Sequence, residues 1–142
     1  MTQGTQQRKI GLGQTAQPTP NYAVAEYSFA TDGGAVSQIT LRGDTVPSTA
    51  QVVDADIIIE TVLTSGGAAT VSVDLEAAGD INAADAISGA PWSVAKPCKA
   101  DKLDAADEGF VTTADRAIKV TVGTAALTAG KFKVVVTYWL LA

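Results

Sequence analysis

Apolar and polar side chains alternate through the last third of the chain, and this period of two constrains the fold more than any other feature. Segment 117–123 places Ile118, Val120 and Val122 on one face. Segment 131–141 repeats the pattern, with Phe132, Val134, Val136, Tyr138 and Leu140 on one face. Such alternation is typical of a β-strand with one buried face. With the turn-forming residues 124–130 between them, the two segments predict a terminal β-hairpin.

The opposite face of segment 131–141 is also apolar near its end, where it carries Val135, Thr137 and Trp139. A monomer would leave this indole in water, and soluble proteins usually avoid contiguous exposed apolar side chains. We therefore expect two layers of cover for this strand. One is the core of the domain, and the other is a second subunit with Trp139 at or near the contact.

Earlier segments also have the composition of strands. We expect strands over 22–29, 36–42, 51–54, 56–64 and 69–76, separated by turns rich in Gly, Asp and Ser. Gly43 and Asp44 are expected to end the second of these. The nearly continuous apolar run in 56–64 predicts a strand covered on both faces. In 69–76, Val71, Val73 and Leu75 should point inward, and the residues between them, Thr70, Ser72, Asp74 and Glu76, should point outward.

The segment 77–90 departs from the strand pattern. Ile81, Ala84 and Ile87 recur at helical spacing after Asp80, a good N-cap residue, and predict one or two helical turns. Residues 91–115 form a charge-rich excursion with weak strands near 92–95 and 109–113. Many short strands and one short helix predict an all-β chain folded as a jelly-roll-like β-sandwich. An all-β barrel of similar size is the alternative.

Residues 1–21 are rich in Gln, Thr, Gly and Pro and predict an extended N-terminal arm. The large apolar residues of the arm are Ile10 and Leu12, and Pro18 and Pro20 stiffen its junction with the domain. Ordering each residue costs about 1–2 kcal/mol of backbone entropy, so the contacts of the arm have to come from a neighbouring subunit or a larger surface. An arm lying on its own domain is the alternative. Residues 22–142 are expected to form one β-sandwich domain, large enough to fold without cross-links.

The composition removes several classes of function. The chain has no histidine and a single cysteine, Cys98, which excludes Ser-His-Asp, Cys-His and histidine metal sites. Cys98 is expected to be a structural, partly buried thiol. A formal net charge of −5 disfavours nucleic-acid binding. A polar start and no apolar window near the ~18 residues of a membrane span predict a soluble protein made in the cytoplasm. We expect no enzymatic activity, no cofactor and no bound metal.

Paired carboxylates are the remaining candidates for chemistry. Asp54 with Asp56, and Asp74 with Glu76, lie two residues apart on one strand face, and a glycosidase uses two carboxylates. The same spacing is common on solvated strands, whereas catalysis needs one carboxyl with a raised pKa in a cleft. We therefore expect these residues to be structural.

Two loop motifs also have ordinary explanations. The acidic run 101–108 spaces its carboxylates three apart, whereas an EF-hand calcium loop uses alternate positions, so a solvated loop or helical turn is the better interpretation. The tripeptide Arg42-Gly43-Asp44 matches an integrin-type adhesion motif. A polar turn that closes a strand explains the same residues.

Several stretches resemble small virion proteins of tailed bacteriophages. They are Asp32-Gly-Gly-Ala-Val-Ser-Gln-Ile-Thr-Leu41, the segment from Val52 to Val73, and the segment from Thr124 to Tyr138. In layout over 22–141, the chain is most similar to head decoration, or cement, proteins. The resemblance implies a small β-sandwich that binds the outside of a capsid as an oligomer, with an arm along the shell. The excursion at 91–115 departs from the plainer pattern of hairpins in such proteins.

The residues and the resemblance together predict a structural virion protein. It would be made in the host cytoplasm, lie on the capsid surface, bind the major capsid protein and reinforce contacts between capsomers. A homo-oligomer is expected, and the resemblance favours a trimer over a dimer. The predicted partner-binding residues are Ile10, Leu12, Pro18, Pro20, Tyr22 and Trp139. The alternative is a receptor- or carbohydrate-binding β-module of a phage tail fibre or baseplate, with Trp92, Tyr22 and Trp139 as candidates for exposed aromatic platforms.

Overall fold

The computed structural model describes residues 19–103 and 109–140. Within these ranges the chain forms nine strands and one short helix. They are β1 (Asn21–Ser28), α1 (Phe29–Asp32), β2 (Gln38–Val46), β3 (Ala50–Ser65), β4 (Thr70–Asp74), β5 (Asn82–Ala86), β6 (Pro97–Lys99), β7 (Phe110–Val111), β8 (Arg116–Gly123) and β9 (Leu127–Leu140). The predicted all-β class is confirmed.

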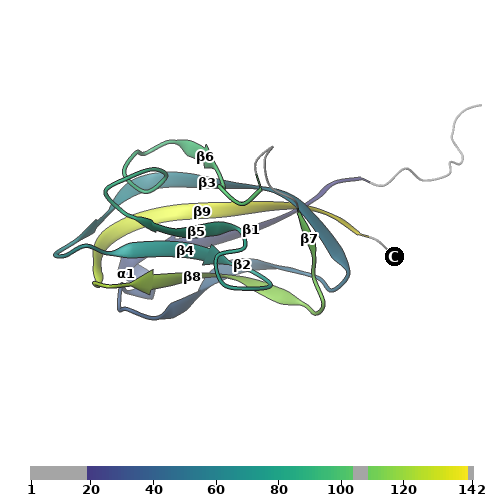
Figure 1. Ribbon diagram of the computed structural model, residues 1–142, viewed down its shortest axis with the longest axis horizontal. Helices are drawn as coiled ribbons and strands as arrows, with labels where there is room; N and C mark the ends of the chain where they lie inside the picture. The colour runs from purple at the N-terminus through teal and green to yellow at the C-terminus, as the bar shows by residue number, and fades with distance from the viewer. Residues whose placement is uncertain (1–18, 104–108, 141–142) are drawn as a thin grey trace, which may run out of the picture.

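The strands form an antiparallel sheet that curls into two packed layers (Figure 1). The strand order is β5-β4-β8-β2-β1-β9-β3-β6, with β7 paired to β3. We call β1, β9, β3, β6 and β7 the first layer, and β2, β8, β4 and β5 the second layer. The layers join where Ala25 and Glu26 of β1 pair with Gly43 and Arg42 of β2. This arrangement is consistent with the predicted β-sandwich.

Residues 100–102, here called the edge strap, follow β6 and connect β3 to the start of β5. Ala100 donates its N–H to the carbonyl of Ala55 in β3 at 3.0 Å, and Lys102 donates to the carbonyl of Ile81 at 3.2 Å. Asp101 donates its N–H to Oδ1 of Asn82 and accepts the N–H of Ala83, both at 2.9 Å. The edge strap therefore bonds to β3 on one side and to the start of β5 on the other.

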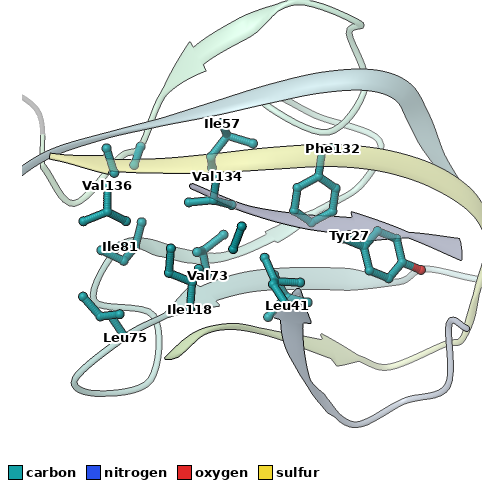
Figure 2. Packing of buried hydrophobic residues seen from close by; sticks show 14 of the residues in the cluster. Tyr27, Leu41, Ile57, Val73, Leu75, Ile81, Ile118, Phe132, Val134 and Val136 are labelled. Atoms are coloured by element: carbon teal, nitrogen blue, oxygen red, sulfur yellow. The ribbon is translucent and has the colours of Figure 1, made fainter. Parts of the chain in front are cut away.

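The core lies between the layers and is centred on Phe132. This residue is fully buried, and its ring centroid lies 5.1 Å from that of Tyr27 and 5.1 Å from that of Trp92. Figure 2 shows that apolar residues of β3 and β9 meet those of the second layer; the labelled examples are Ile57, Phe132, Val134 and Val136 against Leu41, Val73 and Ile118. Burial, with a smaller effect of nearby Asp32, raises the pKa of Tyr27 to about 12. The core is therefore one continuous apolar cluster.

The terminal hairpin predicted from the sequence is wrong. β8 pairs with β2 and β4, whereas β9 pairs with β1 and β3. Residues 124–126 therefore carry the chain from the second layer to the first. The predicted inward faces are correct for both strands up to Val136, but Leu140 is 47% exposed. A period of two identifies a strand and its buried face, but it does not identify the strand with which it pairs.

The helix predicted for 77–90 is also wrong. Residues 82–86 of that segment form β5, and the described helix is α1. Asp80 does not cap a helix; its carboxylate accepts backbone N–H bonds from Leu75, Glu76 and Ala77, each at 2.8 Å. Aspartate commonly closes tight turns in this way. Burial raises the pKa of Asp80, although these three hydrogen bonds act in the opposite direction.

The predicted boundaries of two strands change. β2 does not end at Gly43 but continues to Val46, with a register shift in its pairing with β8. Gly43 has φ +138°, and an added Cβ would collide with the carbonyl oxygen of Val24, so only glycine fits this bend. Segments 51–54 and 56–64 are parts of a single strand, β3, of 16 residues.

Burial also differs from the prediction in two strands. In β3, Ile57 and Ile59 are buried, but Ile58 is only half-buried and Glu60 is exposed, so the strand is not covered on both faces. In β4, Ser72 and Asp74 are buried rather than outward. Hydrogen bonds explain this: Asp74 accepts from the hydroxyls of Ser72 (2.9 Å) and Thr121 (2.6 Å), and from the N–H of Gly79 (2.7 Å).

Replacing the central aromatic residue should test this description of the core. We expect Phe132→Ala to lower the free energy of unfolding by about 3–5 kcal/mol, because removing the ring leaves a cavity beside Tyr27 and Trp92. Urea denaturation measures this quantity. The control Val36→Ala, at a side chain that is 54% exposed, should change it by less than about 0.5 kcal/mol. Similar losses for both variants would contradict the assignment.

Candidate interaction surface

Exposed large apolar side chains collect where β1 begins, β9 ends and β7 lies (Figure 1). Tyr22 is 62% exposed, and Leu140 is almost half exposed. We define the apolar end by the exposed residues Tyr22, Val24, Val53, Val111 and Leu140. The sequence analysis missed Val24, Val53 and Val111, because their clustering depends on the pairing of strands distant in sequence.

The strand register places two of these side chains, Tyr22 and Val24, in neighbouring rows of the outer face. Tyr22 of β1 is opposite Thr137 of β9, which is opposite Asp54 of β3. In the next row, Val24 is opposite Val135, which is opposite Asp56. Because neighbouring strands lie about 4.8 Å apart, each row spans about 10 Å. These rows also contain Thr137, Asp54 and Asp56, and Leu140 lies on the opposite face of β9. Exposed apolar side chains grouped at one end of a sheet are typical of an interaction site.

The other half of this outer face is charged, and its charges are paired. Glu26 lies 3.8 Å from Arg42 and 3.7 Å from Lys131. Glu60 lies 3.6 Å from Lys131 and 3.5 Å from Lys133. Exposed pairs of this kind contribute little to stability. They keep this half of the face hydrated, so the apolar end is the part of the face that needs a cover.

A hydrogen-bonded cluster fixes the loop that carries β7. The buried Thr112 donates its hydroxyl to the carbonyl of Pro47 at 2.6 Å and accepts the N–H of Ala50 at 3.0 Å. Arg116 donates two hydrogen bonds to the carboxylate of Glu76, both at 2.9 Å. The Arg116 guanidinium, together with bonds from Thr113, lowers the pKa of Glu76 to about 2. These contacts hold the apolar end in place before any partner binds.

A hollow of about 390 Å³ adjoins the apolar end between β3 and β7. It is lined by Gln51, Val52, Val53, Gly109, Phe110 and Val111. Phe110 is half-buried, whereas Val53 and Val111 are exposed. The hollow therefore presents both polar and apolar groups beside the apolar end.

The predicted partner-binding residues have different positions. Pro20 and Tyr22 are exposed, and Trp139 is half-buried on the outer face of β9, opposite Gln51. Tyr22 and Trp139 thus lie at the same end of the layer. Ile10, Leu12 and Pro18 lie outside the described residues. Trp92, named as a possible exposed aromatic platform, is fully buried in the core, so that assignment is wrong.

The carboxylate pairs are engaged in structural contacts. Asp54 and Asp56 both lie within reach of the Lys99 ammonium, at 2.5 and 3.1 Å. The hydrogen bonds that Lys99 donates to Asp54 and Asp56 raise the pKa of Lys99. Among residues 19–103 and 109–140, no group of three or more Cys, Asp or Glu side chains is placed to hold a metal ion. Most of the acidic run 101–108 lies outside the described residues.

The structure also locates the adhesion-like tripeptide and the single cysteine. Arg42-Gly43-Asp44 lies within β2 rather than in a turn; Arg42 binds Asp32, and Asp44 accepts the N–H of Val24 at 3.0 Å. Cys98 is a half-buried free thiol, as predicted. In the part of the chain that the structure describes, no helix is both long and apolar enough to span a membrane.

Comparison with known proteins identifies the fold. No protein-family model matches the chain, and no curated protein matches it. A chain of the Cyanophage Pam1 capsid asymmetric unit has a TM-score of 0.62 at 17% identity, covering 94% of each chain. A chain of the acidic stable capsid of Helicobacter pylori bacteriophage KHP30 has a TM-score of 0.60 at 18% identity, covering 89% of this chain and 94% of that one. The fold is one that occurs in bacteriophage capsids.

The low pKa of Glu76 predicts how the stability of the fold changes as the pH falls. The folded value of about 2 lies below the ordinary value of 4.5, so the Glu76–Arg116 contact stabilises the fold above pH 4.5 and loses this effect as the pH falls toward 2. We expect Glu76→Gln to lower the Tm at neutral pH, and the difference from wild type to shrink over that range.

Thermal unfolding followed by circular dichroism at a series of pH values measures this difference. Glu60→Gln is the matched control, because Glu60 makes only long, exposed ion pairs and should change the Tm little at any pH. A difference between wild type and Glu76→Gln that stays constant down to pH 2 would contradict the prediction.

Proposed function

We propose that this protein is a capsid decoration, or cement, protein. It binds the outer surface of a phage capsid, contacts the major capsid protein and reinforces the contacts between capsomers. The observation that carries this proposal is the likeness of fold, over nearly the whole chain, to chains from two bacteriophage capsids. The apolar end supports it, because this surface needs a partner.

The proposed attachment depends on the N-terminal arm, residues 1–21, which leaves the domain beside the apolar end. The arm joins the domain at Thr19 and Pro20, immediately before Tyr22, so both features act at the same end of the molecule. In the arm, Ile10 and Leu12 are the proposed anchors, and each contributes about 1.5–3 kcal/mol when fully buried. Many copies on one shell convert modest contacts into strong attachment through multivalency.

We further propose that the protein is a homo-oligomer, with a trimer favoured over a dimer. The apolar end and the half-buried Trp139 support an association between copies. The trimer follows from the resemblance to decoration proteins, which often occupy three-fold positions of a shell.

A decoration protein binds its partner and needs no catalytic residues. The composition and the contacts of the acidic side chains are consistent with such a role. The chain contains no histidine, and the carboxylate pairs considered for glycoside hydrolysis are bound to Lys99, to Arg116 or to buried hydroxyls. A tail-fibre or baseplate module that binds carbohydrate has less support, because Trp92 is in the core and leaves Tyr22 and Trp139 as its aromatic candidates.

Loss of the arm anchors should weaken attachment to the shell. We expect the full-length variant Ile10→Asp/Leu12→Asp to bind capsids about 100-fold or more weakly than wild type, since two buried anchors are lost. Quantitative co-sedimentation with capsids that lack the protein measures the affinity. Deletion of residues 1–20 should have the same effect and leave a folded sandwich by circular dichroism.

The matched control is Gln7→Asp/Gln14→Asp, which adds the same charge at polar positions of the arm and should bind nearly as wild type does. Cryo-electron microscopy of bound particles then locates the wild-type protein. Density over the shell is expected. Density confined to the tail, or equal capsid binding by wild type and the anchor variant, would contradict the proposal.

A further inference from the structure

The apolar end and the arm have complementary charge. Arg8 and Lys9 are the charged side chains of residues 1–18, while all 15 acidic residues lie later in the chain. Acidic groups border the apolar end on both sides: Asp44 beside Val24, and Asp54 with Asp56 at the ends of the rows formed by Tyr22 and Val24. Lys99 is shared by two of these carboxylates. A basic segment is therefore attracted to this surface.

The apolar residues of the arm also fit the spacing of this surface. Ile10 and Leu12 directly follow the basic pair and are two residues apart. In extended backbone, such residues share a face and lie about 7 Å apart. Tyr22 and Val24 have the same separation along β1, and the hollow beside Val53 and Phe110 offers a further apolar contact. An extended arm can thus place both anchors on the apolar end at once.

The exit of the arm favours a second molecule over its own. Pro20 restricts Thr19 to extended backbone, so the chain entering β1 at Asn21 continues the strand direction outward, beyond Tyr22. To cover its own Tyr22 and Val24, the arm would have to reverse direction within the six residues between Leu12 and Thr19. Those residues instead give Leu12 a reach of up to about 25 Å from the domain, enough to bridge to a neighbouring copy.

We propose that the Arg8–Leu12 segment of one copy docks on the apolar end of a second copy, so that the homo-oligomer is held together by exchanged arms. This deepens the proposed function and rests on its homo-oligomer. Attachment to the shell then depends on the arm through multivalency: a copy without its anchors is a monomer with one contact site, and avidity is lost.

The test uses full-length variants in solution, without capsids. Mass is measured by light scattering at micromolar concentration, and folding by circular dichroism. Wild type should be an oligomer. The arm variant Ile10→Asp/Leu12→Asp and the surface variant Tyr22→Asp/Val53→Asp should each be monomers. The control Val36→Asp, at an exposed apolar residue at the opposite end of the strands, should keep the wild-type mass.

Mixing the two monomeric variants gives the sharper result. The surface variant keeps a working arm, and the arm variant keeps a working apolar end, so together they should form a 1:1 complex. No association in the mixture, or an unchanged mass for either variant, would overturn arm exchange. A monomeric wild type would also overturn it, and would indicate an arm folded back on its own domain.

A covalent trap gives a readout that does not depend on the aspartate variants. In a Cys98→Ser background, one copy carries Leu12→Cys and the other Tyr22→Cys, and oxidation should produce a linked dimer that forms poorly with Val36→Cys in place of Tyr22→Cys. Equal yields would overturn the proposal. An arm variant that stays oligomeric but no longer binds capsids would show that the arm binds the shell; arm exchange would then be wrong while the decoration function would stand.

Discussion

The first layer, the core and the outer face of the protein all depend on β9. Its backbone pairs with β1 on one side and with β3 on the other. Its inner face, which includes Phe132, supplies the centre of the core. Its outer face passes from Lys131 and Lys133 among ion pairs to Trp139 at the apolar end. One strand thus connects the stability of the sandwich to the apolar end.

The sequence predicted which face of a strand is buried, but it did not predict which distant strand it pairs with. The faces of β8 and β9 follow from alternation, but their hairpin does not form, because each strand finds its partners in a different layer. Apolar residues do recur at helical spacing after Asp80. Residues 82–86 nevertheless pair with β4 as a strand, and the Asp80 carboxylate accepts the backbone N–H bonds of the turn before them. Tertiary pairing outweighs a weak helical preference.

The interaction surface was predictable only in part, for the same reason. Trp139 was predicted to contact a partner because the outer face of its strand is apolar near the end, and Tyr22 was predicted with it as a large aromatic residue. Val53 and Val111 become neighbours through the pairing of β3 with β7, a contact across more than fifty residues that no local pattern encodes. Trp92 was misjudged because it lies in a turn-rich segment, where burial depends on the cavity that the two layers leave beside Phe132.

The edge strap has a consequence for contacts between copies of the protein. An open strand edge is a template for uncontrolled strand addition, and sandwiches are vulnerable to polymerisation through such edges. Here Asp101 donates its N–H to Asn82 and accepts the N–H of Ala83, while Ala100 donates its N–H to Ala55 of β3. These backbone groups are therefore paired within one molecule. Where the edge strap lies, a second copy can therefore be contacted through side chains but not through these paired backbone groups.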